Sequence, residues 1–154
     1  MLKLSEFTPH TNAVIKQIMD SDVAEHCIIV EGEADTAASF CDLPFAHLLF
    51  TGSTSVGRKV MQAASKNLTP VTLELGGKSP VVILDDMNIK EAAKTLLFGK
   101  LNNAGQICVA PDYVFVPKKL EHQLVLQLCE LYKKHFKQGV EGKNLTSIVS
   151  DRQY

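Results

Sequence analysis

Cys108 is the side chain in this sequence with the clearest chemical potential. It lies in the loop 102–111, between a helical pattern and a strand pattern, and the small residues around it leave its sulfur open to a carbonyl group. Only a few per cent of an ordinary thiol is thiolate at pH 7, so a nucleophilic cysteine needs a base or a positive dipole beside it. On these residues alone, Cys108 is either a nucleophile or a small buried side chain.

Glu74 is the carboxylate best placed to be that base. It ends an apolar strand pattern, where burial could raise the pKa of a carboxyl group toward that of a working general base. The glycines Gly76 and Gly77 follow it and leave that part of the backbone free to move. A surface ion pair between Glu74 and Lys78 fits the same residues.

The histidines offer no alternative base, because none has the spacing of a catalytic Cys–His pair. They are His10, His26, His47, His122 and His135. We expect His47, inside a strand pattern, to be a core or edge histidine with its own partner. A cysteine protease therefore has no support, and a carboxylate acting directly or through water remains.

A second constellation surrounds Gly52, Ser53 and Gly57, where a strand pattern turns into a helix pattern. Glycines at a helix N-terminus let backbone N–H groups approach an anion, which the helix dipole also favours. Thr54 breaks the G-x-G-x-x-G dinucleotide fingerprint, and Arg58-Lys59 do not match a phosphate-binding P-loop. An ordinary turn between strand and helix is the alternative.

The elements that hold these residues alternate between strands and helices. Apolar runs predict strands at 27–30, 46–51, 71–74, 80–84 and 113–116, and helical spacing predicts helices after Thr8-Pro9 and at 35–40, 54–64, 88–101 and 120–136. This alternation predicts an α/β fold with a mostly parallel sheet. We expect the pair Gly76-Gly77 to mark a boundary between subdomains, and the short tail at Ile148-Val149 to close nothing.

Composition narrows the class of protein further. The chain has 154 residues, of which 45% are hydrophobic and 21% are charged, with a net charge of −1, so neither nucleic acid nor an anionic membrane is an expected partner. No apolar run reaches the roughly 18 residues of a membrane span, and no signal peptide is evident.

The cysteine spacing fits neither a metal site nor a disulfide framework, so we expect reduced thiols, no metal and a cytoplasmic protein. Cys27 and Cys129 lie in apolar patterns and are expected in the core, because free cysteines are often buried. Cys41 is expected to close a helix.

Taken together, three segments resemble the aldehyde dehydrogenase superfamily. They appear in the family's order and are Phe50-Thr51-Gly52-Ser53-Thr54, Leu73-Glu74-Leu75-Gly76-Gly77-Lys78-Ser79-Pro80 and Asn103-Ala104-Gly105-Gln106-Ile107-Cys108. The separation of Glu74 from Cys108 also matches. The run that begins at Cys108 and continues through Tyr113 looks most like the class 3 and coniferyl aldehyde dehydrogenase branch.

The resemblance implies a role for each matching residue. Cys108 would attack an aldehyde to form a thiohemiacetal, and Glu74 would activate the water that hydrolyses the later thioester to a carboxylic acid. The backbone N–H of Cys108 resembles one donor of an oxyanion hole. Ile107 stands where threonine is common in the family.

The resemblance also implies a cofactor site for NAD, with NADP possible. Gly52 and Ser53 would lie against the pyrophosphate, with Val56 and Gly57 behind them. Lys3 and Glu6 match the segment that holds the adenosine ribose, although Leu4 replaces its usual proline. The charge of Glu6 would disfavour a 2′-phosphate, which favours NAD.

Residues 1–76 then resemble the latter part of a Rossmann-like dinucleotide-binding domain, and 77–154 the start of the catalytic domain. The family's upstream asparagine, its nicotinamide-side segment and its oligomerisation strands have no match here, so we expect a central fragment, inactive alone, of a homodimeric or homotetrameric enzyme. A non-catalytic nucleotide-binding or interaction module, and a cofactor-free thiol hydrolase that uses Cys108 and Glu74, remain alternatives.

Overall fold

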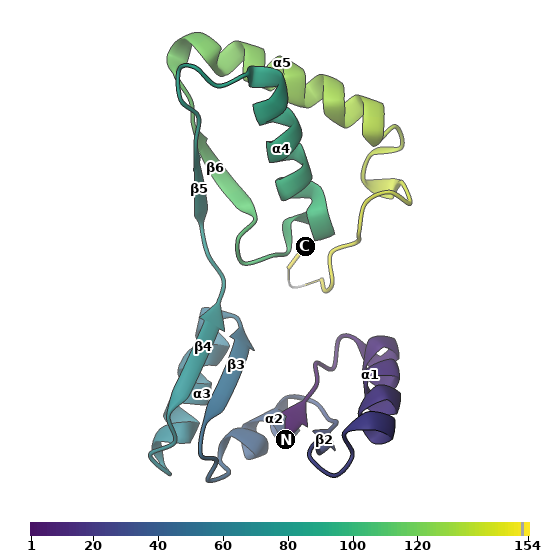
Figure 1. Cartoon of the computed structure of the whole chain (residues 1–154), viewed down its shortest axis with the longest axis vertical. Coiled ribbons are helices and arrows are strands. Elements are labelled where there is room, and N and C mark those ends of the chain that lie inside the picture. The colour runs from purple at the N-terminus through teal and green to yellow at the C-terminus, as the bar shows by residue number, and fades with distance from the viewer. Residues whose placement is uncertain (152) are drawn as a thin grey trace. The chain divides into compact units, whose positions relative to one another are not determined.

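The structure is a computed structural model, and it describes residues 1–151 and 153–154. The chain divides into two compact units, Met1–Leu75 and Gly76–Tyr154. In the first unit the elements are β1 (Leu2–Lys3), α1 (Pro9–Asp22), β2 (Ile29–Val30), α2 (Ala34–Cys41), β3 (Leu48–Gly52), α3 (Thr54–Ser65) and β4 (Val71–Leu75) (Figure 1). In the second they are β5 (Ser79–Val82), α4 (Ile89–Leu101), the 3-10 turn η1 (Asn102–Gly105), β6 (Pro111–Phe115), α5 (Lys118–His135) and the 3-10 turn η2 (Gly139–Glu141).

Strand pairing is parallel throughout the described residues, as the alternation of strands and helices predicts. The strands form three two-stranded sheets, β1–β2, β3–β4 and β5–β6. Strand β1 was not predicted, because a strand of two residues is too short to carry a hydrophobic pattern. The parallel α/β class is therefore confirmed.

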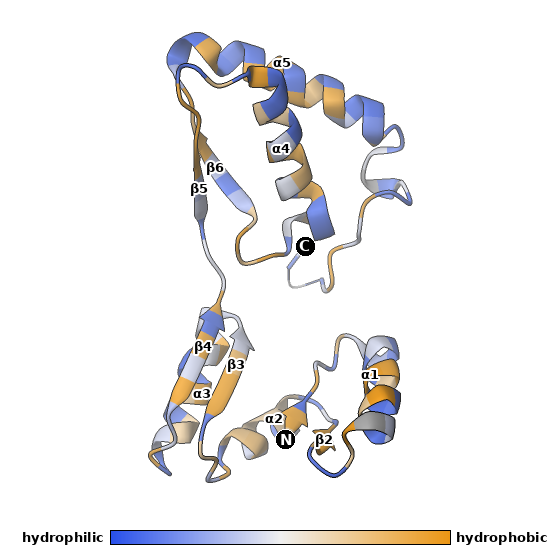
Figure 2. Ribbon diagram, viewed as in Figure 1, coloured by the Kyte–Doolittle hydropathy of each residue, from blue (hydrophilic) through white to orange (hydrophobic). Residues whose placement is uncertain are grey.

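In the first unit, α3 packs on the β3–β4 pair. Leu48, Val60 and Ala64 are buried between these elements, and strand β3 is mostly apolar in Figure 2. Gly57 makes the packing close: a Cβ built on it would lie 2.8 Å from Leu75 Cδ2. A larger residue at position 57 would have to displace the end of the Leu75 side chain.

The core of the second unit lies between the β5–β6 pair and the two helices α4 and α5 (Figure 1). Its buried members are Ile83, Ile89, Ala92, Ala93, Leu96 and Leu124. Ala92, Ala93 and Leu96 thus form the buried face of α4. Asn88 caps this helix, since its side-chain oxygen accepts hydrogen bonds from Lys90 N at 3.0 Å and Glu91 N at 3.3 Å.

Burial differs from the sequence patterns in two places. Val14 and Ile18 of α1 are each 55% exposed although they share one helix face, and Cys129 is exposed on α5. The expected core role of Cys129 is therefore wrong for this chain, whereas Cys27 is half-buried. Helical spacing shows which residues share a face, but not whether another element covers that face.

Two further expectations concern single elements and the membrane. Cys41 closes α2 as predicted, and burial, followed by the charge of Asp42, raises the pKa of its thiol. Within the described part of the chain, no helix combines the length and apolarity that crossing a membrane requires.

Candidate active site

Cys108 lies in an exposed turn between η1 and β6. The backbone N–H of Ala110 donates to Ile107 O at 3.0 Å and closes the turn around the cysteine. Among the described residues none accepts a hydrogen bond from the N–H of Cys108, so that donor points to no protein partner. The turn therefore presents both a thiol and an unused backbone donor.

The backbone before Cys108 adopts a costly conformation. Asn103 and Ala104 have φ values of 50° and 54°, in the left-handed region that residues with a side chain rarely occupy, and Gly105 follows at 77°. Asn103 and Gln106 hold this stretch: Asn103 Nδ2 donates to Gln106 O at 3.2 Å, and Gln106 N donates to Asn103 O at 3.0 Å. The loop thus has a defined shape.

The segment around Gly77 touches the carbonyl of Cys108. Ser79 Oγ donates to Cys108 O at 3.5 Å, and a Cβ built on Gly77 would lie 2.9 Å from the same oxygen. Only a glycine lets the backbone at position 77 run this close to the cysteine turn. The sequence suggested that this glycine gives the backbone freedom to move. The structure instead gives it a steric role, because a side chain at this position would clash with Cys108 O.

Glu74 lies near the end of β4 and is exposed. Burial of this carboxylate, one of the two possibilities that the sequence left open, is therefore not found. The alternative ion pair also differs from the expectation, because Lys78 Nζ binds Asp112 Oδ2 at 2.7 Å. What the structure provides is an accessible carboxylate, on the opposite unit of the chain from Cys108.

The carboxyl end of the β3–β4 pair collects several of the predicted site residues. Thr51 is the register partner of Glu74, and Gly52 that of Leu75, so the turn that starts α3 begins beside Glu74. Ser53 caps α3, with its Oγ accepting from Val56 N at 3.3 Å. The carboxyl ends of parallel strands are where ligands bind in open α/β sheets.

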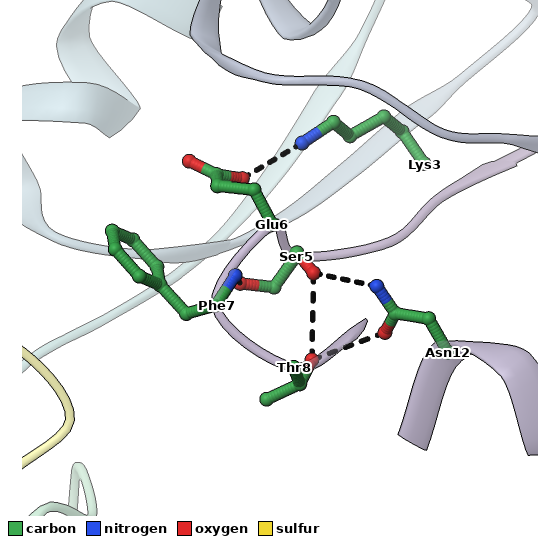
Figure 3. Close-up of polar contacts among 6 residues, drawn as sticks. All are labelled: Lys3, Ser5, Glu6, Phe7, Thr8 and Asn12. Atoms are coloured by element: carbon green, nitrogen blue, oxygen red, sulfur yellow. Dashed lines mark hydrogen bonds and ion pairs between the residues drawn. The ribbon is translucent and has the colours of Figure 1, made fainter. Parts of the chain in front are cut away.

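Lys3 ends β1 and pairs with Glu6, which lies in the turn after the strand (Figure 3). Lys3 Nζ lies 2.9 Å from Glu6 Oε2, and this hydrogen bond holds the pKa of the Glu6 carboxyl below its ordinary value of 4.5. The turn between them and α1 is tied by Asn12, whose Nδ2 donates to Ser5 O at 2.7 Å and whose Oδ1 accepts from Thr8 Oγ1 at 3.0 Å. The pair therefore sits on an ordered turn.

His47 has its own partner, as expected for an edge histidine. Its Nε2 lies 3.0 Å from Thr72 Oγ1, and the residue is exposed.

An open groove of about 420 Å³ in the second unit is lined mainly by apolar residues of α4, β6 and α5, including Leu96, Val114 and Cys129. Cys108 is not among the residues that line it, so the groove is separate from the nucleophile candidate.

Comparison with known proteins identifies the family. The model of the aldehyde dehydrogenase family matches residues 1–154. The chain belongs to the aldehyde dehydrogenase family. A Pseudomonas aeruginosa relative named "Probable coniferyl aldehyde dehydrogenase" is 47% identical over 154 residues, which are 99% of this chain and 32% of the relative.

Solved structures of aldehyde dehydrogenases share the fold. A substrate-bound state of Staphylococcus aureus AldH has a TM-score of 0.85 at 40% identity, over 96% of this chain and 33% of that one. A cysteine-to-alanine mutant of Pseudomonas syringae aldehyde dehydrogenase C, in complex with NAD+ and octanal, has a TM-score of 0.83 at 25% identity, over 99% and 33%. This aldehyde dehydrogenase chain thus spans about a third of the length of the curated relatives it matches.

Several residues of this aldehyde dehydrogenase chain gained importance only from the structure. Gln106, Ser79 and Asp112 contact or flank the cysteine turn, and Asn12 organises the turn after Glu6. Gln106 and Ser79 lie inside the segments that resemble the family, so the sequence already marked these two positions as candidates. Nothing in the sequence around Asn12 sets it apart.

Proposed function

We propose that this chain supplies the nucleophile, the general base and part of the cofactor site of an enzyme that oxidises an aldehyde to a carboxylic acid with NAD. The observation that carries the proposal is the exposed Cys108 turn, with its unused backbone donor, inside a chain that matches the family model from end to end. Cys108 and Glu74 belong to different units, and the family motifs carry their pairing.

Cys108 acts first in the proposed reaction. Its sulfur, as a thiolate, forms a bond to the aldehyde carbon, and the carbonyl oxygen becomes an oxyanion. The free N–H of Cys108 is a suitable donor to this oxygen; removal of such a donor in another enzyme costs about 10²–10³ in rate. Bound NAD would supply the hydride acceptor for this adduct, and loss of the hydride would leave Cys108 joined to the substrate as a thioester.

Glu74 acts second. Its carboxylate takes a proton from a water molecule, whose oxygen adds to the thioester carbon. The carbon–sulfur bond then breaks, so the carboxylic acid leaves and the thiolate of Cys108 is restored. The exposure of Glu74 is compatible with binding of that water.

The first unit has the features that a dinucleotide needs. The first-turn N–H groups of α3, after Gly52 and Ser53, can face a pyrophosphate, and Gly57 lets the helix approach β4 while Val56 follows the cap. Glu6 is ionised at neutral pH, as an ordinary glutamate is, and its pairing with Lys3 lowers its pKa further, so it can accept hydrogen bonds from ribose hydroxyls beside Lys3. The same charge repels a 2′-phosphate, which favours NAD over NADP.

Other parts of the proposal rest on the relatives. A coniferaldehyde-like aldehyde is the suggested substrate, after the name of the Pseudomonas aeruginosa relative. A rat relative is named as dimeric and NADP-preferring, so both a dimeric enzyme and the use of NADP occur within the family. We propose residues 1–76 as part of the dinucleotide-binding domain and 77–154 as part of the catalytic domain. All four cysteines are free thiols, which fits a cytoplasmic location.

Thiol labelling tests the nucleophile on the chain as it stands. Iodoacetamide modification, followed at each cysteine by mass spectrometry, should be several-fold faster at Cys108 than at Cys129, which is equally classed as exposed and serves as the internal control. An activated ester should also leave an acyl group on Cys108 that is absent in Cys108→Ser. Equal rates at the two cysteines would favour a non-catalytic module, and ester turnover without cofactor would favour a thiol hydrolase.

A further inference from the structure

Gln106 joins the cysteine loop to a segment much later in the chain. Its Oε1 accepts a hydrogen bond from Val149 N at 2.9 Å, and its Nε2 donates to Ser147 O at 3.1 Å. One carboxamide thus meets a donor and an acceptor of the same backbone stretch, as a neighbouring strand would. The expectation that the tail at Ile148-Val149 closes nothing is therefore wrong.

The same side chain also binds the costly part of the loop. Gln106 Nε2 donates to Asn103 O at 3.0 Å, the carbonyl of the first of three consecutive residues with positive φ. Such backbone persists only where its surroundings hold it. Asn103 and Gln106 fix each other, and among the residues that the structure describes the side chain of Gln106 connects this pair to Ser147 and Val149.

We propose that Gln106 is a positioning residue for Cys108, and that the backbone at 147–149 is the anchor against which it holds the loop. Gln106 is half-buried and lies two residues before Cys108, so a shift at Gln106 moves the start of the turn that presents the thiol. On the far side of the turn, Ser79 donates to the carbonyl of Cys108, and Gly77 lies against the same oxygen. The role in catalysis rests on the proposed function; the clamp itself rests on the hydrogen bonds.

Two substitutions and one control separate this role from general stability. Gln106→Ala removes all three side-chain hydrogen bonds. Gln106→Glu keeps the length and an acceptor for Val149 N–H but removes the donor to Ser147 O and Asn103 O. Gln127→Ala is the control, because Gln127 is a glutamine of the same unit whose side chain donates to Glu130 within α5 and, in the described part of the chain, has no hydrogen bond to the cysteine loop.

Hydrogen exchange followed by NMR gives the direct readout. Val149 N–H reports the anchor, Ala110 N–H reports the turn that contains Cys108, and the amide of Ala93, buried in α4, reports global unfolding. In Gln106→Ala, exchange at Val149 and Ala110 should become about tenfold faster relative to Ala93, as expected for hydrogen bonds that are each worth a several-fold change in population. In Gln106→Glu, the exchange rate of the Ala110 amide should rise as it does in Gln106→Ala. The Val149 amide should keep part of its protection from exchange, because the glutamate still offers it an acceptor.

Alkylation gives the second readout. The rate at Cys108 relative to Cys129 should fall several-fold in both variants and stay unchanged in Gln127→Ala. Unchanged exchange at Ala110 together with unchanged alkylation of Cys108 would overturn the proposal, because Gln106 would then only fasten the tail. A Cys108 that reacts no faster than Cys129 in the unsubstituted chain would count against the proposed nucleophile, whereas exchange at Ala110 would still decide the clamp.

Discussion

At the scale of single residues, the backbone of the Cys108 turn makes the contacts that give the site its shape. Gly77 approaches Cys108 O more closely than any side-chain-bearing residue could, and Ser79 donates to the same oxygen. The sequence motif contains both residues. A glycine in a motif can serve backbone flexibility or close approach of two segments, and only the three-dimensional structure shows which of these applies at Gly77.

Substitution at Gly77 should therefore disturb the turn, and the neighbouring glycine provides the control. A Cβ on Gly77 would meet the Cys108 carbonyl at 2.9 Å, whereas a Cβ on Gly76 has no atom within 4 Å. We expect Gly77→Ala to destabilise the second unit by about 1–3 kcal/mol and Gly76→Ala by less than about 0.5 kcal/mol. Urea denaturation measures both, and equal midpoints would contradict the close contact.

The Lys3–Glu6 pair leads to a prediction about pH. The pKa of Glu6 is lowered, so the stabilisation by its ionised form is present above 4.5 and is lost as the pH falls through the lower folded value. Because the pair is partly exposed, Glu6→Gln should cost only about 0.2–1 kcal/mol at pH 7. That cost should shrink toward zero at pH 3.

Urea unfolding at the two pH values, compared between wild type and variant, isolates this effect from other carboxylates. Glu25→Gln is a suitable control, because Glu25 is exposed and the described residues give it no ion pair or hydrogen bond. A cost of Glu6→Gln that is the same at both pH values would argue against an ionic contribution.

At the scale of elements, the sequence predicted the type and order of the helices and strands well, and the burial of individual side chains less well. The helix from Asn88 to Leu101 was predicted from helical spacing over several turns, whereas its cap at Asn88 emerged only from the structure. The spacing of Val14 and Ile18 places them on one face of α1, yet both side chains are exposed. Cys129 was misjudged for the same reason, since burial depends on distant segments rather than on local pattern.

The cap of α4 gives the element-scale prediction. Asn88 satisfies two backbone donors of the first turn, so Asn88→Ala should destabilise the second unit by about 1 kcal/mol. Asn88→Ser retains a good cap and should stay close to wild type. Thermal unfolding followed by circular dichroism compares them, and a serine variant as unstable as the alanine one would show that capping is not the cause.

At the scale of the whole molecule, large apolar side chains are exposed in both units. On the β5–β6 sheet, Val81 and Val114 face the core, while Val82 and Phe115 on the other face are 65% and 59% exposed. Parallel sheets in α/β proteins are normally covered on both faces. The relatives, of which this chain spans about a third, contain further chain that could provide such cover.

The 154-residue chain alone should therefore show little or no aldehyde-dependent formation of NADH, even with Cys108 reactive toward iodoacetamide. Orienting an aldehyde, a nicotinamide and a thiolate together accounts for much of an enzyme's rate, and reacting atoms must be held within about 3–3.5 Å. The described residues offer an accessible thiol rather than an enclosed aldehyde pocket around it. NADH fluorescence with an aromatic aldehyde, compared with Cys108→Ser, measures this. Robust NADH production that disappears in the serine variant would show that the chain is sufficient for catalysis.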